Sequence, residues 1–371
     1  MTSPGDVVAP PQADRSSVKR ALARVGRGAR RVAEALATPL LPEDFIDLVD
    51  PLRSGADLRG RVVAVTPETP TATTILIRPG RGWRGHRPGQ YTRIGVDVDG
   101  VRHWRAYSIT SPVGAETISI TVRAIPDGRV SNHVRHGLRP GAVLMLDQAT
   151  GDFVLPDPAP DRVLFLTAGS GITPVMGMLR NDPLPRDVVV VHSAPTSGDM
   201  LFRRDLTALA AQGRISLVTR FTGTDGILPV TALDGVVPDW RDRDVWVCGP
   251  TGLLDDAEAH WAAAGLSGRL HTERFRPRIH AVGDGGEVTF TGAGVTVAAD
   301  AATTLLDAGE DAGVLMPSGC RMGICFNCVL PLTDGSVRDL RTGEVTTANP
   351  EDPVLVQTCV SAAAGPCHLR V

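Results

Sequence analysis

The 371-residue sequence has little of three features that would indicate a membrane-spanning, nucleic-acid-binding or secreted protein. It contains no apolar run of about 18 residues, so we expect no segment to span a bilayer. Its formal net charge of −3 argues against nucleic-acid binding by the protein as a whole. Six cysteines are crowded toward the C-terminal end without a secretory leader, so a disulfide framework is not expected. We therefore expect a cytoplasmic globular protein, and its length predicts two or three domains.

Four cysteines are spaced like the ligands of a plant-type [2Fe–2S] cluster. Cys320 and Cys325 enclose four residues, Cys325 and Cys328 enclose two, and Cys359 follows after thirty more. This is the C-x4-C-x2-C spacing with a distant fourth cysteine. A structural zinc site is the alternative, although zinc sites usually come as paired C-x2-C knuckles. We predict that these four thiolates hold an iron–sulfur cluster.

The period of the apolar residues divides the chain into an N-terminal extension and three domains. The extension covers residues 1–57. Short β-rich runs between Pro and Gly predict an antiparallel β-barrel over residues 58–160. Strands that alternate with helices predict an α/β domain with a parallel sheet over residues 161–280. Residues 286–371 carry the cluster cysteines and predict a small α+β domain of the β-grasp type.

Residues 16–38 of the extension predict a basic amphipathic helix. One face carries apolar residues and the rest carries six basic residues, with Arg15 a seventh just before the helix, against the single acidic Glu34. Such a helix fits peripheral contact with an anionic membrane, here the inner face of the cell membrane. Docking on the protein's own surface or on an acidic partner is the alternative.

The motif Arg105-Ala-Tyr107-Ser108 places a guanidinium, an aromatic ring and a hydroxyl on one strand. Together these groups can bind a phosphate and stack on a flavin ring. With Gly128 and Ser131 in DGRVSNH, the motif resembles the flavin domain of the ferredoxin–NADP reductase superfamily. The resemblance implies that Arg105 binds flavin phosphate, that Tyr107 stacks on the isoalloxazine, and that Ser108 hydrogen-bonds near its N5. It also implies that the turn from Gly128 to Ser131 closes over a pyrophosphate, which favours FAD and leaves FMN as the alternative.

A glycine-rich loop follows the predicted strand VLFLT and opens a helix, so its N–H groups can meet a phosphate. Its residues are Gly169, Ser170, Gly171, Thr173 and Pro174. The third glycine of a G-x-G-x-x-G fingerprint is absent, with Pro174 in its place, so this is not an ordinary Rossmann opening. The loop instead resembles the G-x-G-x-x-P nucleotide loop of the same superfamily.

Cys248, Gly249 and Pro250 end the predicted strand DVWV and resemble the superfamily's C-G-P turn beside the nicotinamide. The resemblance implies that Cys248 lies near the hydride path, and a buried inert thiol is the alternative. Tyr107, Ser108 and Cys248 are accordingly the predicted catalytic residues.

Two further positions concern the nucleotide and the flavin. Arg220 follows a sheet strand at the place where NADP-preferring relatives carry a basic residue for the 2′-phosphate, and no acidic residue clearly ends the second strand. NADPH is therefore predicted over NADH. Phe275, in HTERF, resembles an E-x-F element that lies near the flavin in oxygenase reductases.

The modules together imply an electron path from NADPH to FAD, to the cluster and to a protein acceptor. Residues 38–52, 100–112 and 308–325 resemble the oxidoreductases that serve membrane-bound fatty-acyl-CoA desaturases, which makes such a desaturase the expected acceptor. Reductases of ring-hydroxylating or haem monooxygenases have the same modules and stay an alternative. A non-enzymatic zinc or redox-sensing protein is the alternative of another class. Arg321 and Met322, at the rim of the cluster loop, are the residues expected to contact the acceptor.

Overall fold

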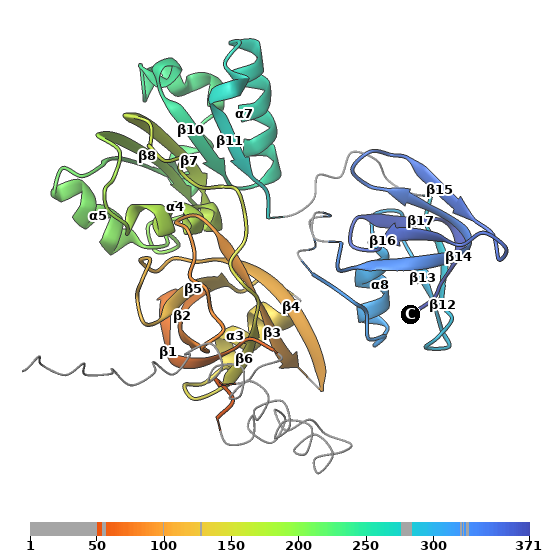
Figure 1. Ribbon diagram of the computed structural model, residues 1–371. Helices are drawn as coiled ribbons and strands as arrows, with labels where there is room; N and C mark the ends of the chain where they lie inside the picture. The colour runs from red at the N-terminus through yellow and green to blue at the C-terminus, as the bar shows by residue number, and fades with distance from the viewer. Residues whose placement is uncertain are drawn as a thin grey trace, which may run out of the picture.

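Three sheets, each with its own hydrophobic core, follow one another along the chain (Figure 1). The computed structural model describes residues 50–53, 57–98, 100–126, 128–275, 284–319, 321, 323 and 326–371. The predicted basic helix of residues 16–38 lies outside the described residues, as do Cys320, Cys325 and Met322.

The first sheet has six antiparallel strands in the order β4-β3-β6-β1-β2-β5. The elements of this unit are β1 (Arg59–Thr69), β2 (Ala72–Pro79), β3 (Tyr91–Val98), β4 (Val101–Ser108), β5 (Ile118–Arg123), α3 (Arg129–His136) and β6 (Val143–Leu146). Ile109, just after β4, forms a bridge with Ile120 of β5. Because β4 and β5 are the two edge strands, this bridge closes the sheet into the predicted barrel.

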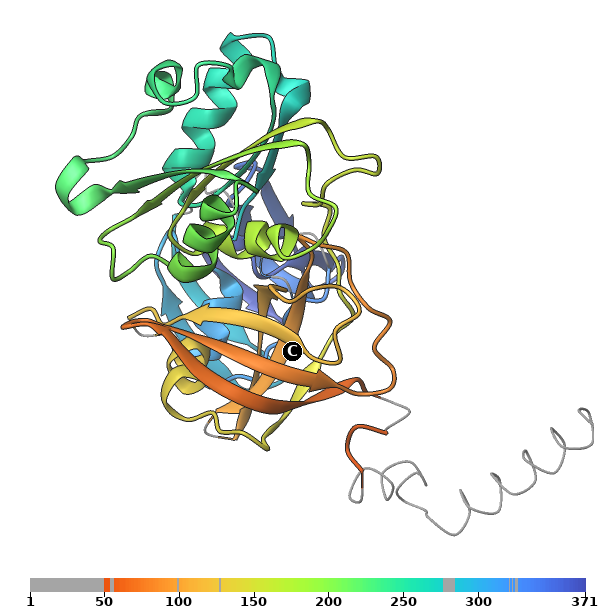
Figure 2. The same ribbon diagram turned by 90° about the vertical axis from the view of Figure 1, so that its left-hand side faces the viewer.

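The second sheet has five parallel strands in the order β11-β10-β7-β8-β9. Its strands are β7 (Arg162–Ala168), β8 (Asp187–Ala194), β9 (Ser216–Phe221), β10 (Asp244–Cys248) and β11 (Leu270–Glu273). Its helical segments are η1 (Gly169–Gly171), α4 (Ile172–Leu179), α5 (Arg203–Ala211), α6 (Thr222–Asp225), η2 (Val230–Gly235), η3 (Trp240–Asp242), α7 (Thr251–Ala263) and η4 (Ser267–Arg269). Figure 2 shows this green layer above the orange and yellow strands of the barrel.

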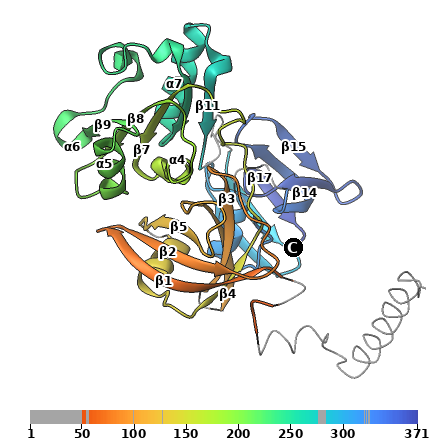
Figure 3. The same ribbon diagram turned by 60° about the vertical axis from the view of Figure 1, so that its left-hand side comes forward.

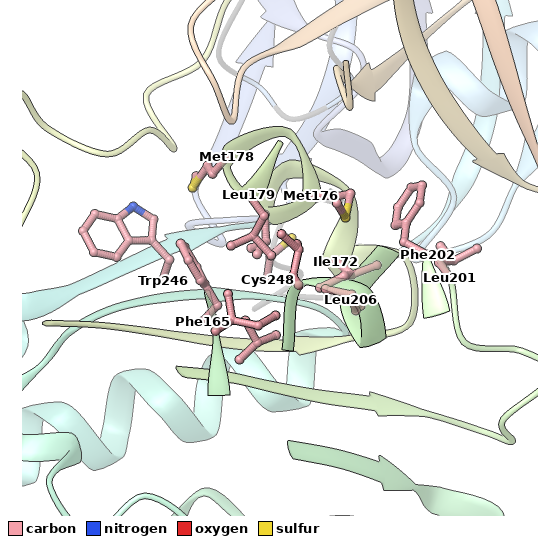
Figure 4. Packing of buried hydrophobic residues seen from close by; sticks show 14 of the residues in the cluster. Phe165, Ile172, Met176, Met178, Leu179, Leu201, Phe202, Leu206, Trp246 and Cys248 are labelled. Atoms are coloured by element: carbon pink, nitrogen blue, oxygen red, sulfur yellow. The ribbon is translucent and has the colours of Figure 1, made fainter. Parts of the chain in front are cut away.

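Alternation along the strands of the parallel sheet builds two separate cores. Val163 and Phe165 of β7 pack with residues of α4 and α5 on one face, a cluster that Figure 4 shows from close by. Leu164 and Leu166 pack with residues of α7 and η2 on the other face. Since successive side chains of a strand point to opposite faces, a nearly continuous apolar strand such as β7 is buried on both sides.

The third sheet is mixed, with β12 and β17 parallel and the other pairs antiparallel. Its elements are β12 (Gly286–Phe290), β13 (Val295–Ala299), α8 (Leu305–Asp311), β14 (Val329–Asp339), β15 (Val345–Ala348), β16 (Val354–Gln357) and β17 (Ser361–Leu369). Helix α8 begins at Thr304, whose Oγ1 accepts a hydrogen bond from the Asp307 amide at 3.1 Å and so caps the helix. Leu305 and Leu306 then pack into the core of this unit.

The three units confirm the predicted fold class: an antiparallel barrel, a parallel α/β sheet and a small α+β domain. Several elements were not expected from the sequence, among them strands β11, β15 and β17 and helix α3. Leu270–Glu273 forms the edge strand β11 in a stretch interpreted as a connection, because four half-buried residues carry too short a pattern to be recognised. Arg129–His136 forms helix α3, where the resemblance had suggested a turn. In Figure 3 the third unit, drawn in blue, lies beside β3 and β4 of the barrel.

Candidate functional site

The R-x-Y-S residues lie on β4 at a cavity of about 230 Å³ between the barrel and the parallel sheet. Tyr107 pairs with Thr92 and Ser108 with Tyr91 across the ladder between β3 and β4. The cavity is lined from six separate segments of the chain by Tyr91, Arg105, Ala106, Tyr107, Ser108, Thr121, Arg123, Ile125, Ser170, Thr173, Glu273, Phe275 and Arg321. The structure thus brings the R-x-Y-S residues, two residues of the glycine-rich loop and Phe275 to one place.

A hydroxyl contact joins the flavin strand to the nucleotide loop. Thr173 Oγ1 donates to the Ser170 carbonyl at 2.9 Å and hydrogen-bonds to Ser108 Oγ at 3.2 Å, and the Ser108 and Thr173 side chains are buried. A buried hydroxyl that finds two partners fixes the rotamers on both sides. This contact holds the start of α4 against the end of β4.

Burial sets the charge state of the two largest motif side chains. It raises the pKa of Tyr107 to about 12, so the phenol stays protonated at neutral pH. Burial also lowers the pKa of Arg105, with repulsion from Arg321 as the next cause, but a guanidinium remains charged. Arg105 Nη1 donates to the Trp104 carbonyl at 2.8 Å, and its Nη2 lies 3.8 Å from Glu310 Oε2.

The glycine-rich loop is shaped by close backbone approach. Gly169 has a φ of +56°, the left-handed region that favours glycine. A Cβ on Gly171 would lie 2.0 Å from the carbonyl oxygen of Cys248, so only glycine lets η1 pack on the end of β10. Pro174 lies in the first turn of α4, where its missing N–H leaves no helical hydrogen bond unmade.

Two further cavities continue the flavin cavity along the carboxyl ends of β7, β8 and β10. One of about 360 Å³ is lined by Arg123, Ala168, Gly169, Ser170, Gly249, Pro250, Thr251, Leu254, Arg274 and Phe275. The other, of about 420 Å³, includes Ser193, Thr222, Ile227 and Pro250 in its lining. All three share Arg123, so a single groove runs from the flavin cavity across the glycine-rich loop. Ligands of parallel α/β sheets bind at this edge.

Cys248 lies below the groove in the hydrophobic core rather than in the lining of the three cavities. Its side chain packs among the residues around Phe165 and Ile172 (Figure 4). Burial raises the pKa of the Cys248 thiol well above its usual value, so the thiol stays protonated. Its backbone carbonyl, which meets Gly171, is the part of the residue that shapes the loop. The assignment of Cys248 to the hydride path remains a prediction.

Arg220 is engaged with the backbone of the turn that follows β9. Its Nε donates to the Gly226 carbonyl at 3.1 Å and its Nη2 to the Asp225 carbonyl. Thr222 and Ile227 from this turn line the 420 Å³ cavity, so Arg220 lies next to that cavity without lining it. Its predicted contact with a 2′-phosphate remains untested.

Gly128 and Ser131 lie at the start of α3, outside the lining of the flavin cavity. Ser131 Oγ accepts from the Ile125 amide at 3.3 Å and donates to the Gly128 carbonyl at 3.2 Å. The hydroxyl therefore fixes the approach to the helix. Ile125, which it holds, does line the cavity, so the predicted pyrophosphate role for this segment stays open.

Two of the four predicted iron ligands are described, and they lie together. Cys328 and Cys359 are buried, and a hydrogen bond between their side chains is the main cause that lowers the pKa of Cys328 to about 6. A thiolate is the form that binds metal, so this pair suits the predicted cluster. Among the described residues no group of three metal-ligating side chains occurs, since Cys320 and Cys325 lie outside them. Cys367, which lies outside the motif, packs in the core of the third unit.

The loop between the cysteines is held from the side of β14 and β16. The Gly323 carbonyl accepts from Arg341 Nη1 at 3.0 Å and from Gln357 Nε2 at 3.1 Å. Gly323 itself has a φ of +73°, and a Cβ there would lie 2.4 Å from Arg341 Nη1. The positive φ favours glycine at this position, and a Cβ would displace the Arg341 guanidinium that donates to the Gly323 carbonyl.

Arg321 corrects one expectation from the sequence. Its side chain was predicted at an outer rim that meets the acceptor, yet it lines the flavin cavity and is only 16% exposed. It reaches Asp307 Oδ1 at 2.9 Å and also pairs with Glu310. Two acidic residues of the same unit therefore hold the guanidinium inward, an arrangement that spacing alone does not reveal.

Sequence reasoning missed one charged residue of the flavin cavity, Arg123, and placed another, Glu273, only as part of the E-x-F element near the flavin. Arg123 ends β5 and borders all three cavities, and its position at the end of a predicted strand was the only signal. Glu273 ends β11 in the flavin cavity, where burial raises its pKa to about 8. Glu273 Oε2 is buried and has no hydrogen-bond partner among the described residues. A cavity that offers a guanidinium, an aromatic ring, hydroxyls and an unmatched carboxyl oxygen fits a bound flavin.

Within the described part of the chain, no helix is both long enough and apolar enough to span a bilayer.

Comparison with known families identifies two of the three units. Residues 83–155 match the family described as oxidoreductase FAD-binding domain. Residues 288–364 match the family described as 2Fe-2S iron-sulfur cluster binding domain. The second match decides between the iron–sulfur cluster and the zinc site in favour of the cluster.

Comparison with individual proteins covers nearly the whole chain. An NADPH oxidoreductase of Mycobacterium tuberculosis is 49% identical over 354 residues, which are 92% of each chain. The glycine betaine monooxygenase reductase subunit of Pseudomonas aeruginosa is 30% identical over 307 residues, covering 74% of this chain and 84% of its own. The structure of phthalate dioxygenase reductase matches 85% of this chain and 98% of its own, with a TM-score of 0.61 and 18% identity, so it supports the fold.

Proposed function

The chain belongs to the ferredoxin–NADP reductase superfamily as an NAD(P)H-dependent oxidoreductase with FAD and a C-terminal [2Fe–2S] domain, and from that premise we propose that it is the reductase component of a two-protein oxidising system. In this proposal it takes NADPH and delivers single electrons to an iron-containing partner protein. The observation that carries the proposal is the groove that joins the glycine-rich loop, the flavin cavity and Arg321 of the cluster loop.

The bound groups supply the redox chemistry, because FAD accepts a hydride as two electrons and a [2Fe–2S] cluster takes one electron at a time. The residues of this chain bind, orient and shield. Arg105 and Arg123 provide positive charge for phosphates, and Tyr107 provides a ring face. The contact between Thr173 and Ser108 holds the nucleotide loop at the flavin cavity, which favours a fixed distance between the two sites.

NADPH is the proposed hydride donor rather than NADH. Ser193 at the end of β8 lines the 420 Å³ cavity where an acidic residue would bind a ribose 2′-hydroxyl. Arg220 lies beside that cavity on the next strand, paired with Ser193 in the ladder. The 49% identical relative is named an NADPH oxidoreductase, which supports the same choice.

Two acceptors are candidates. The resemblance carried by residues 38–52, 100–112 and 308–325 favours a membrane-bound fatty-acyl-CoA desaturase, and in that case residues 16–38 would assist contact with the membrane. The relatives named as reductase subunits of glycine betaine monooxygenase favour a monooxygenase of that kind. Both need single electrons, so the site alone does not separate them.

Reconstitution separates the two candidates. The purified protein is combined with NADPH and oxygen, in parallel, with membranes that contain a desaturase and with a purified monooxygenase component, and the oxidised product is measured. We expect product with the true partner and none when Cys328→Ser replaces the unmodified protein. If neither partner yields more product with the reductase than without it, the proposed function is wrong.

A further inference from the structure

One carboxylate stands between the flavin site and the cluster loop. Glu310 lies in the last turn of α8, and its side chain is 11% exposed. Its Oε2 lies 3.8 Å from Arg105 Nη2 on barrel strand β4, and its Oε1 pairs with Arg321 Nη2 of the cluster loop. The two oxygens of a single side chain thus contact the predicted flavin-phosphate arginine and an arginine next to a predicted iron ligand.

The Glu310 carboxylate and the two guanidinium groups that it contacts are largely shielded from water. The side chains of the two arginines are 29% exposed for Arg105 and 16% for Arg321. Ion pairs gain strength as water is removed, and charge-assisted hydrogen bonds are about twice as strong as neutral ones. Removal of the central anion would leave two partly buried cations near each other, with Asp307 as the remaining partner of Arg321.

Arg321 links this contact to the flavin cavity. It has a φ of +58° and lines the cavity from the side of the third unit. Asp307 holds the same guanidinium at 2.9 Å, so α8 fixes the side chain from two positions. The cluster loop therefore reaches the flavin cavity through an arginine whose direction α8 determines.

We infer that Glu310 is the positioning residue that holds the cluster loop against the flavin cavity, so that electron passage from flavin to cluster depends on its carboxylate. The inference rests on the proposed function, since it concerns the internal step of that path. Without the carboxylate the third unit spends less time in the arrangement competent for transfer, and the observed rate falls with that fraction.

The same helix offers a matched control. Asp311 follows Glu310 directly, and its Oδ1 lies 3.9 Å from Arg129 Nη2 of α3. Its side chain is 77% exposed, and exposed ion pairs of this kind contribute little. Asp311→Asn therefore removes one negative charge from α8 without touching the contact with Arg105 and Arg321.

The test mixes the holoprotein with NADPH under anaerobic conditions. It follows bleaching of the flavin and, by freeze-quenching, the electron paramagnetic resonance signal of the reduced cluster. We expect all variants to bleach at the same rate, Glu310→Gln to reduce its cluster about tenfold more slowly, and Asp311→Asn to match the unmodified protein. Equal cluster rates in Glu310→Gln and the unmodified protein, or equal slowing in the two variants, would overturn the inference.

The salt dependence of the rate of cluster reduction separates an ion-pair role of Glu310 from a general structural role, which would leave that dependence unchanged. No diffusing partner takes part in the internal step, so its salt dependence reports an ion pair within the chain. We expect added salt to slow cluster reduction in the unmodified protein toward the rate of Glu310→Gln, and to leave that variant unchanged. Small-angle X-ray scattering should show a larger radius of gyration for Glu310→Gln and for the unmodified protein in high salt.

Failure of the inference is distinct from failure of the proposed function. An unmodified protein that bleaches its flavin and never reduces its cluster contradicts the proposed function. If Glu310→Gln does not retain its iron, the salt titration of the unmodified protein tests the role of Glu310 instead. A rate of cluster reduction that does not change with salt would then overturn that role.

Discussion

Gly171→Ala is the substitution whose effect the structure defines most closely. The new Cβ would lie 2.0 Å from the Cys248 carbonyl oxygen, 2.4 Å from the carbonyl carbon and 2.7 Å from the Gly249 amide nitrogen. Carbon and oxygen atoms normally approach no closer than about 3.3 Å. The start of α4 and the turn after β10 would therefore have to separate by roughly 1.3 Å. All three neighbouring atoms belong to the backbone, so no side chain can rotate away.

The cost follows from overpacking a closely packed junction. Such insertions destabilise by about 1–3 kcal/mol, and we expect a value near 2 kcal/mol here. That loss corresponds to a fall in melting temperature of about 4–8 °C when the barrel and the parallel-sheet unit unfold together, as a unit of about 150–250 residues. Because Gly169 and Gly249 on the two sides of the junction line the groove, we also expect the KM for NADPH to rise about tenfold.

Thermal unfolding by circular dichroism and steady-state reduction of a flavin-accepting dye measure the two effects. Gly268→Ala is the matched control, because Gly268 lies in η4 and a Cβ there would meet nothing within 4 Å. We expect this control to keep the melting temperature and the KM of the unmodified protein. If Gly171→Ala behaved like Gly268→Ala, the close approach of the two loops would be refuted.

Three other substitutions test separate parts of the site. Arg105→Ala should weaken flavin binding by about tenfold or more, measured as flavin retained after dialysis, and full retention would contradict its phosphate role. Arg220→Gln should raise the KM for NADPH about tenfold and leave the KM for NADH nearly unchanged, whereas an equal rise for both would remove the 2′-phosphate assignment. Glu273 has a pKa of about 8 in the folded state against an ordinary value near 4.5, so between these pH values the unfolded chain binds fewer protons and stability falls as pH rises. Glu273→Gln should therefore lose part of the fall in melting temperature between about pH 5 and pH 8, and an unchanged pH profile would show that the carboxyl is not buried in solution.

Much of the fold was predictable because local patterns repeat over whole elements. The apolar run of β7 and the alternating strands and helices after it indicated a parallel sheet, and the structure has that sheet. Short elements were not predictable in the same way. Strand β11 has four residues, all half-buried, and its identity comes from pairing with β10 rather than from its own sequence.

The residues of the candidate site were likewise predictable where they belong to a motif and not predictable where their role depends on contacts between distant segments. Arg105, Ser108 and Thr173 were found because each belongs to a motif, and the structure brings them to one cavity. The inward direction of Arg321 was not predictable, since it depends on Glu310 and Asp307 of a helix packed nearby. The raised pKa of Glu273 has the same origin, because burial between units leaves no trace in the sequence around it.

An anaerobic titration with NADPH tests the central claim most directly. Flavin absorbance and the electron paramagnetic resonance spectrum are recorded on the same samples of the purified protein. The proposed path predicts that NADPH bleaches the flavin and that the signal of a reduced [2Fe–2S] cluster then appears, while Cys328→Ser shows the bleaching without the signal. A flavin that bleaches in the unmodified protein with no cluster signal at any NADPH concentration would contradict the path.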